Sequence, residues 1–327
     1  MNDGSWLVQL VRLRILGKSP TNAYLRLNQQ LWSKLPASVT ALPLARRYGN
    51  FLHAVARIQS ARGQLFHTFF LRNKATLELT RRLVERHTTT DTLRVAVLGC
   101  STGAEAYSVA WRIRSVRHDL KLVFHAVEIS PEALKIAESG VYSSASSQFA
   151  GKDVFDRVTP AEIHELFDRT GDAFTVKRWI KEGINWLVGD AGDPEIVNAL
   201  GQQDIVFANN FLCHMDPPAA EQCLRNIARL VGPCGYLFVS GIDLDIRTKV
   251  ARELGWQPVQ ELLEDIHEGD PRMGSSWPFH YSAVEPLDKS RKDWRLRYAS
   301  VFQLDPSAEG RGNIGGSGLV KSRSGVV

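Results

Sequence analysis

The sequence predicts an α/β fold, in which a largely parallel sheet carries helices on both faces and a small helical module precedes it. Short apolar runs alternate with amphipathic stretches between about residues 64 and 245, which is typical of such a sheet. One of these runs, residues 94–98, breaks into a glycine-bounded turn that continues as a helical pattern. With 327 residues and 44% hydrophobic content the chain can bury a large core. We therefore expect one α/β domain with appendages rather than two equal domains.

The part of the chain before the sheet reads as short amphipathic helices. Apolar residues such as Leu10 and Leu13 recur there at helical spacing, and Pro36 and Pro43 interrupt the pattern. The expected divisions are a helical module over 1–63, an α/β domain over 64–304 that includes an aromatic-rich extension over about 246–304, and a Gly- and Ser-rich tail over 305–327 that should be disordered.

Within the α/β domain, the apolar runs expected to form strands are 94–98, 122–127, 184–188, 204–208 and 235–240. Helical patterns follow the first run and also cover 131–139 and 247–254.

The turn after the first strand reads Gly99-Cys100-Ser101-Thr102-Gly103. A strand, a glycine-bounded turn and a helix let the backbone approach a nucleotide-like ligand and direct the helix N-terminus at it. The two glycines lie four positions apart, which matches neither the dinucleotide fingerprint nor the phosphate loop. A nicotinamide or flavin oxidoreductase is therefore disfavoured.

The second strand ends at Glu128. A carboxylate at this place in a βαβ unit accepts hydrogen bonds from both hydroxyls of a ribose. The alternative is a solvent-exposed carboxylate, because most glutamates are exposed. The position of Glu128 after the glycine turn favours the ribose role.

Together these residues resemble the S-adenosylmethionine (SAM)-dependent methyltransferases, and more narrowly the chemotaxis receptor methyltransferase (CheR) family. The family motif GCSTGEEPYS resembles GCSTGAEAYS at 99–108, and its acidic segment resembles residues 126–142. Upstream, a T-x-F-F-R element resembles 68–72, with one Phe replaced by Leu. Downstream, an R-N-x-x-x-Y-F-D segment resembles 209–216. The resemblance runs from about residue 64 to about residue 242.

The resemblance implies a Rossmann-like class I methyltransferase that binds SAM and releases S-adenosylhomocysteine, and it favours methyl transfer to an oxygen of a carboxylate or hydroxyl. The acceptor, a small molecule or a protein carboxylate, is left open. The residues implied to bind the cofactor are Thr68, Arg72, Gly99, Cys100, Ser101, Thr102, Gly103, Glu105, Glu128, Ile129, Asp190, Ala191, Asn209 and Asn210.

Several of these residues also have structural alternatives. The resemblance implies that Asp190 accepts from the adenine amino group, and the alternative is a loop-capping role that Asp193 also suits. Asn210 is expected at the methionine part of the cofactor, with an Asx turn as the alternative. Glu105 suits both the methionine ammonium and the positive end of its helix.

Arg72 and His214 are the candidate catalytic residues. In the family, the Arg of the first element and the Tyr of the last line the methyl-transfer site; here Arg72 is retained, His214 replaces the Tyr and Asn209 replaces the leading Arg. A guanidinium binds a carboxylate bidentately, and an imidazole deprotonates a hydroxyl or amine. A structural histidine is the alternative for His214. The replacement favours an acceptor other than a receptor glutamate.

Two other functions stay open: a protein-glutamate O-methyltransferase acting on chemoreceptors, and a non-catalytic module that binds SAM or docks a protein. Aromatic and cationic side chains crowd residues 269–302, which suits a substrate lid or packing onto the sheet.

The charge distribution is uneven. The net charge is only +5, from 40 basic and 35 acidic residues, but basic residues dominate the first 62 positions. This pattern suits an acidic protein partner or simply solvated helix faces, and no motif indicates nucleic acid. The four cysteines form no C-x-x-C pair, so neither a disulfide framework nor a metal site is expected. Without a spanning segment or a signal peptide pattern, a cytoplasmic location is expected.

Overall fold

The structure is a computed structural model. It describes residues 19–59, 68–87, 91–143, 152–269, 277–281 and 284–304. The helical pattern of residues 5–18 and the expected disordered tail lie outside the described residues.

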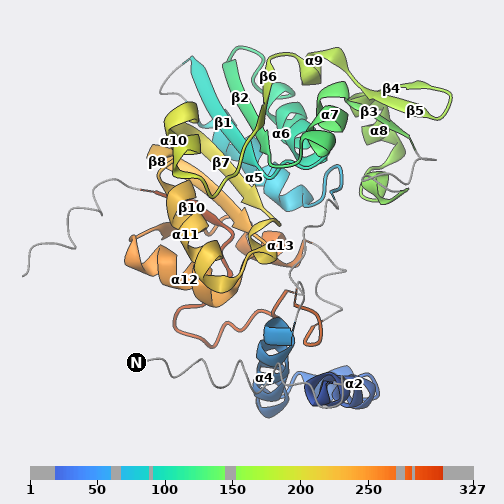
Figure 1. The fold of residues 1–327 in the computed structure, drawn as a ribbon, viewed down its shortest axis with the longest axis vertical. Coiled ribbons are helices and arrows are strands. Elements are labelled where there is room, and N and C mark those ends of the chain that lie inside the picture. The colour runs from blue at the N-terminus through green and yellow to red at the C-terminus, as the bar shows by residue number, and fades with distance from the viewer. Residues whose placement is uncertain are drawn as a thin grey trace, which may run out of the picture.

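A seven-stranded sheet forms the centre of the α/β domain, with the strand order β6-β2-β1-β7-β8-β10-β9 (Figure 1). The five predicted strands are confirmed, each lying within the observed strand and one with the same bounds, and they pair in parallel. The antiparallel edge strands β9 and β10 were not predicted, because they are only two and three residues long. The bounds are β1 Thr92–Leu98, β2 Lys121–Glu128, β6 Ile184–Val188, β7 Gln203–Asn209, β8 Val231–Ser240, β9 Gln257–Pro258 and β10 Val301–Gln303.

Helices cover both faces of this sheet, as predicted. Successive side chains of a strand point to opposite faces, so Val95 and Val97 join one core cluster while Ala96 and Leu98 join the other. The first cluster lies under α5 and α6, and the second under α11 and α12. The helices of this domain are α5 Lys74–Glu85, α6 Ala104–Arg114, α7 Pro131–Ser139, α10 Pro194–Leu200, α11 Pro217–Ala228, α12 Leu244–Glu253, α13 Leu263–Glu268 and α15 Trp294–Tyr298.

The helix expected over 247–254 begins three residues earlier, at Leu244. Asp245 stands in its first turn, where a carboxylate interacts favourably with the positive end of the helix. Leu254 is the residue that caps the end of this helix rather than part of it.

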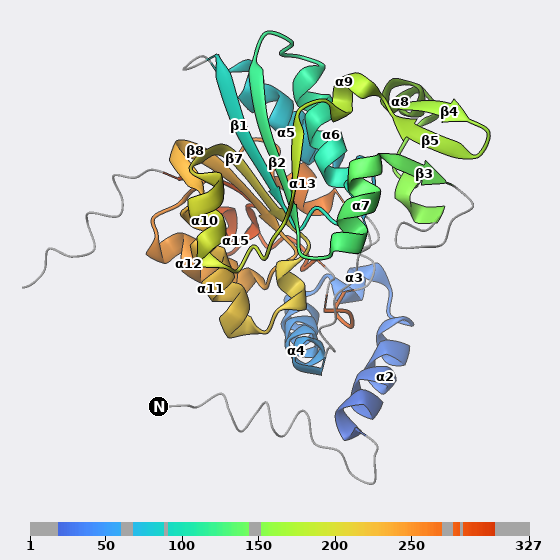
Figure 2. The same cartoon turned by 45° about the horizontal axis from the view of Figure 1, so that its top comes forward.

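A three-stranded antiparallel sheet, with the order β3-β5-β4, is inserted between α7 and β6 (Figure 2). The sequence did not predict it, because its strands have only three or four residues. Packed aromatic rings hold it to the domain. The ring of Phe70 contacts those of Tyr142 and Phe167 edge to face, with 4.9 Å and 4.8 Å between the ring centres. Its elements are β3 Val141–Ser143, η1 Lys152–Phe155, α8 Pro160–Leu166, β4 Phe167–Thr170, β5 Ala173–Val176 and α9 Arg178–Lys181.

The N-terminal region is helical over its described residues, with α2 Pro20–Trp32, α3 Ala37–Thr40 and α4 Pro43–Gln59. Figures 1 and 2 show α2 and α4 at one end of the molecule, away from the small sheet. Residues 277–281 and 284–287 contact α4. The Nδ1 atom of His53 lies 3.2 Å from the carbonyl oxygen of Pro278, and Arg46 donates to the carbonyl of Leu287 at 3.2 Å. None of the helices described is long and apolar enough to cross a membrane.

Candidate functional site

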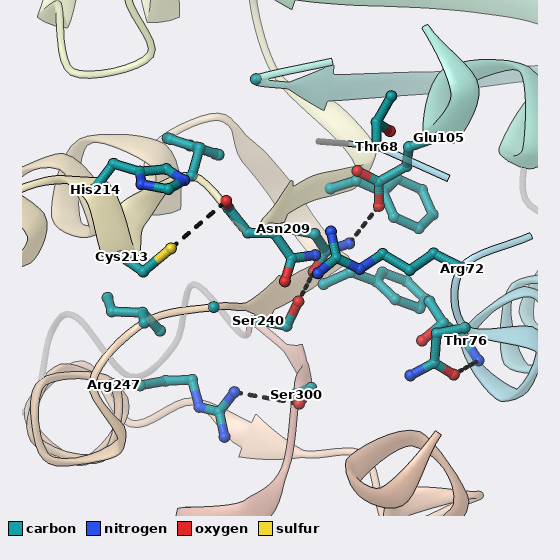
Figure 3. Close-up of a pocket in the computed structure, with 18 of the residues that line it drawn as sticks. Thr68, Arg72, Thr76, Glu105, Asn209, Cys213, His214, Ser240, Arg247 and Ser300 are labelled. Atoms are coloured by element: carbon teal, nitrogen blue, oxygen red, sulfur yellow. Dashed lines mark hydrogen bonds between the residues drawn. The ribbon is translucent and has the colours of Figure 1, made fainter. Parts of the chain in front are cut away.

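A cavity of about 690 Å³ opens at the carboxyl ends of the parallel strands, where open α/β sheets bind their ligands. Figure 3 shows part of its lining. The predicted site residues that line the cavity are Thr68, Arg72, Gly99, Ser101, Glu105, Glu128, Ile129, Asp190, Ala191, Asn209, Asn210 and His214.

The glycine turn brings its backbone to the cavity wall. Gly99 has φ +64°, and a Cβ atom there would lie 2.8 Å from the ring of Phe211. Gly103 has φ +90° and begins α6, where a Cβ would lie 2.9 Å from the Cβ of Ala137. The turn therefore requires glycine at both ends, for conformation and for space.

The other predicted turn residues are not among those that line the cavity. Cys100 is buried, and burial raises the pKa of its thiol well above the ordinary value. Thr102 is buried too, and its carbonyl accepts a hydrogen bond from Tyr142 at 2.5 Å. Cys100, Thr102 and Gly103 thus shape the turn rather than face the cavity.

Glu128 lies at the end of β2 with only 4% of its surface exposed. Its Oε2 accepts from the amide of Ser101 at 2.7 Å, and its Oε1 accepts from the amide of Ser130 at 3.0 Å. The alternative of a solvent-exposed carboxylate is therefore wrong. Two backbone amides fix the orientation of an anion that faces the cavity.

Glu105, Asn209 and Ser240 form a hydrogen-bonded chain across the cavity (Figure 3). Asn209 Nδ2 donates to Glu105 Oε1 at 2.7 Å, and Ser240 Oγ donates to Asn209 Oδ1 at 2.8 Å. Burial raises the pKa of Glu105, while the bond from Asn209 and the charge of Arg72 oppose that rise. The guanidinium of Arg72 also lies 5.4 Å from the centre of the Phe69 ring.

Asp190 follows β6 and keeps its carboxylate exposed at the cavity. Its Oδ1 accepts from the amide of Gly192 at 2.8 Å, so it closes a turn as well as lining the cavity. Asp193 accepts from the amide of Glu195 at 2.9 Å and caps α10. The capping role expected as the alternative is thus shared by both aspartates.

Asn210 and His214 lie on the segment after β7. Asn210 has φ +62°, and its backbone N–H donates to the carbonyl of Ser240 at 3.0 Å. A Cβ at Gly241 would lie 2.5 Å from the Cα of Asn210, so the two loops pass very close together. His214 ends the short helix η2, Leu212–His214, and its ring is on the cavity side in Figure 3.

Much of the rest of the cavity lining was not predicted from the sequence. A large part of it comes from α4, which was expected only as a helix, and from residue 243 onward. The aromatic-rich extension was the one signal for it, and the structure shows that this extension both packs on the sheet and lines the cavity. The additional residues include His53, Arg57, Asp243, Arg247, Ile266, His267, Tyr281, Val284, Glu285, Ser300 and Val301.

Comparison with known proteins concerns mainly the half of the cavity beside the glycine turn. The sequence model of the family described as CheR methyltransferase, SAM binding domain, matches residues 67–244. The chain is similar to the probable biofilm formation methyltransferase WspC of Pseudomonas putida, at 26% identity over 182 residues, which is 54% of this chain and 40% of that protein. It is also similar to chemotaxis protein methyltransferase 1 of Vibrio cholerae, at 26% identity over 149 residues, which is 44% of this chain and 51% of that protein.

The chain spans about half or less of the length of these curated relatives. Among solved structures, magnesium protoporphyrin IX methyltransferase (ChlM) from Synechocystis PCC 6803 with bound SAM is similar over 69% of this chain and 91% of that one, with a TM-score of 0.33 and 13% identity. The family match covers more than half of the present chain and includes the glycine turn, Glu128 and Asn209. The chain therefore belongs to the CheR methyltransferase family and carries its SAM-binding domain.

Proposed function

We propose that this chain is a SAM-dependent methyltransferase that transfers a methyl group to an oxygen atom of its acceptor. The observation that carries the proposal is Glu128. It is a buried carboxylate, held by two backbone amides, that faces a cavity beside a glycine turn within the matched family domain. A buried anion aimed into a cavity needs a hydrogen-bond donor, and a ribose diol supplies two.

The described side chains fit the cofactor. Glu128 would accept from the ribose hydroxyls, and the exposed carboxylate of Asp190 would accept from the adenine amino group. Glu105 and Asn209 would lie beside the methionine part, where a carboxylate suits an ammonium group. Gly99 lets the backbone come close, because any Cβ there would meet Phe211.

When bound, SAM supplies a sulfonium-activated methyl carbon: the acceptor oxygen bonds to this carbon while the electron pair of the carbon–sulfur bond returns to sulfur. The chain must then align the acceptor rather than form a covalent intermediate. Arg72 would orient the acceptor oxygen through its guanidinium. His214 would take the proton of a hydroxyl acceptor, whereas a carboxylate acceptor needs no base.

A second candidate is methylation of protein glutamates on chemoreceptors, and the surface of the N-terminal helices supports it. Residues 19–59 contain no Asp or Glu. Leu27, Leu31, Leu44 and Phe51 are exposed there, which suits an acidic protein partner with an apolar contact surface. We place the reaction in the cytoplasm, where free thiols such as those of this chain stay reduced.

Calorimetric titration with SAM and with S-adenosylhomocysteine tests the cofactor proposal. The unchanged chain should bind both, and Glu128→Gln should weaken binding about tenfold or more, which corresponds to about 1.4 kcal/mol. Glu132→Gln is the matched control, because Glu132 is exposed in the first turn of α7, close to Glu128 in the chain.

Absence of binding to the unchanged chain would overturn the proposal. Binding without transfer of labelled methyl to any acceptor would instead identify a non-catalytic SAM-binding module. Thermal unfolding of both variants shows whether lost binding reflects a lost fold.

A further inference from the structure

The cavity has two halves with different origins. The half beside the glycine turn lies within the family match, residues 67–244. The other half is lined largely by residues outside that match, and we call it the acceptor chamber. It is defined by His53, Arg57, Ile266, Tyr281, Val284 and Val301.

Next to the acceptor chamber, α4 packs against residues 277–281. A Cβ atom at Gly49 would lie 2.2 Å from the Trp277 ring, so α4 packs directly on this indole. Trp277 also contacts Trp32 edge to face, with 5.7 Å between the ring centres. Together with the contact between His53 and Pro278, these interactions hold α4, which contributes His53 and Arg57 to the chamber lining, against residues 277–281.

The charges around the acceptor chamber are largely matched to one another. Arg57 lies 3.5 Å from Asp243 and 3.1 Å from Asp245, as measured between side-chain nitrogen and oxygen. Arg297 contacts Asp245 and Glu285, each at 2.8 Å. A bound molecule therefore meets carboxylates and guanidinium groups that already have partners.

One further cation, Arg247, is fully buried in the wall of the acceptor chamber. Its guanidinium donates to the carbonyls of Val239 at 2.8 Å and Arg297 at 3.0 Å and to the hydroxyl of Ser300 at 3.2 Å (Figure 3). Only about 2% of Arg247 is exposed, so a ligand in the chamber has little access to it. The cations Arg57 and Arg247 of the lining, with Arg297 behind it, are thus balanced by the carboxylates Asp243 and Glu285 of the lining and by Asp245 behind it.

Burial lowers the pKa of both His53 and His267, that of His267 to about 4, and so favours their uncharged forms. His267 Nε2 is 2.7 Å from the carbonyl oxygen of Glu285, so its ring is also engaged. Of the other lining side chains, Phe69, Leu77, Ile266, Val284 and Val301 are apolar, and Asn73, Thr76, Tyr281 and Ser300 are polar but uncharged.

We propose that the acceptor is a small molecule whose uncharged, largely apolar body lies in the acceptor chamber and whose oxygen faces Arg72 and His214. A charge-balanced and mainly apolar chamber favours such a body. It disfavours a receptor segment with several glutamates, because each extra carboxylate would be desolvated beside described guanidinium groups, those of Arg57, Arg247 and Arg297, that already have partners. The inference rests on the proposed methyl transfer and adds the class of its substrate.

Labelled SAM tests the proposal. The full chain is incubated with methyl-labelled SAM and with an extract of the source cells, separated into a low-molecular-mass fraction and a protein fraction. We expect label in an organic-solvent-extractable product of the low-molecular-mass fraction. Alkali then distinguishes the acceptor oxygen, because a methyl ester releases labelled methanol and a methyl ether does not.

A variant that fills the chamber provides the second readout. Val284→Phe should lower small-molecule labelling by roughly tenfold or more, because the larger ring takes up volume in which the acceptor would lie. SAM affinity should stay the same, since Val284 lies in the half away from the glycine turn. Val141→Phe is the matched control, because Val141 is 45% exposed on β3 and does not line the cavity.

Label confined to the protein fraction, or small-molecule labelling that Val284→Phe leaves unchanged, would overturn the inference. So would a chain that binds SAM but labels no small molecule. These outcomes differ from failure of the proposed function itself, in which the unchanged chain does not bind SAM.

Discussion

The side chain of Asn209 donates to the carboxylate of Glu105 across 2.7 Å, although 104 residues separate them in the chain. The bond joins the end of β7 to the first turn of α6 at the cavity wall. Asn209 stands where the family segment has an arginine. In this chain a neutral amide, with the nearby charge of Arg72, thus meets a buried carboxylate.

Asn209→Asp should destabilise the fold and weaken SAM binding at neutral pH. The change replaces a hydrogen bond by two carboxylates at contact distance, and such a pair must share a proton. Acidification should restore part of the lost stability, which thermal unfolding over a range of pH will measure. Asn198→Asp is the control, because Asn198 also donates to a glutamate, Glu195, but on an exposed helix where solvent screens the charge. Equal effects of the two variants would contradict the prediction.

Glu105→Gln should raise the melting temperature at neutral pH. Burial raises the pKa of Glu105 above its unfolded value, so the folded state binds the proton more tightly than the unfolded state does. Ionisation therefore opposes folding above the raised pKa, and this cost disappears as the pH falls below the unfolded pKa of about 4.3. The gain from Gln should vanish over the same interval.

The same variant should bind SAM more weakly, because the proposed partner of the methionine ammonium loses its charge. A Glu105→Gln chain that is less stable than the unchanged one at every pH would contradict the stability argument. Unchanged SAM affinity would contradict the binding role alone.

The half of the cavity beside the glycine turn was predictable because its signals are local. Gly99 and Gly103 bound one short turn, and Glu128 ends an apolar run, so their roles follow from spacing within one strand or one turn. The structure adds how Glu128 is held, through amides of Ser101 and Ser130. Those contacts follow from the same two strand ends.

The acceptor chamber was not predictable in the same way. His53 and Pro278 meet across 225 residues, and no periodicity or motif marks either as a neighbour of the other. Val284 lies in a segment without helix or strand, where pattern analysis has no repeat to detect. The small sheet was missed because strands of three or four residues are too short to show alternation.

Gly99→Ala should both destabilise the chain and abolish SAM binding. The new methyl group meets the Phe211 ring at 2.8 Å, and φ +64° adds the usual cost of about 1 kcal/mol for an L-residue in this conformation. Gly171→Ala separates the two effects, since Gly171 has φ +61° but no atom within 4 Å of the added Cβ. Chemical denaturation should show a clearly larger loss for Gly99→Ala, and equal losses would mean that crowding by Phe211 is unimportant.

Glu78→Gln should lower the stability of the chain by about 1 kcal/mol at neutral pH, a value that allows for solvent screening of a partly exposed group. Three guanidinium groups, from Arg81, Arg82 and Arg112, bond to this carboxylate. They hold the pKa of Glu78 well below its usual range, so the stabilisation is present above the unfolded pKa and is lost as the pH falls toward the folded one. High salt should reduce the difference between the two chains. Denaturation curves that show no difference in low salt would contradict this account.

His214→Gln should lower labelled methyl transfer about a hundredfold if the acceptor is a hydroxyl, because the variant loses the group that takes its proton. SAM affinity should not change, and Cys213→Ala, at a neighbouring cavity position, should leave transfer nearly unaffected.

His214→Tyr restores the side chain of the family segment. It should retain transfer to a carboxylate, which needs no base, and lose transfer to a hydroxyl. The alkali test of the product must agree with these activities. If the product is a methyl ester, the Tyr variant should be active. If the product is a methyl ether, the Tyr variant should be inactive. An ether product from a fully active Gln variant would exclude His214 as the base.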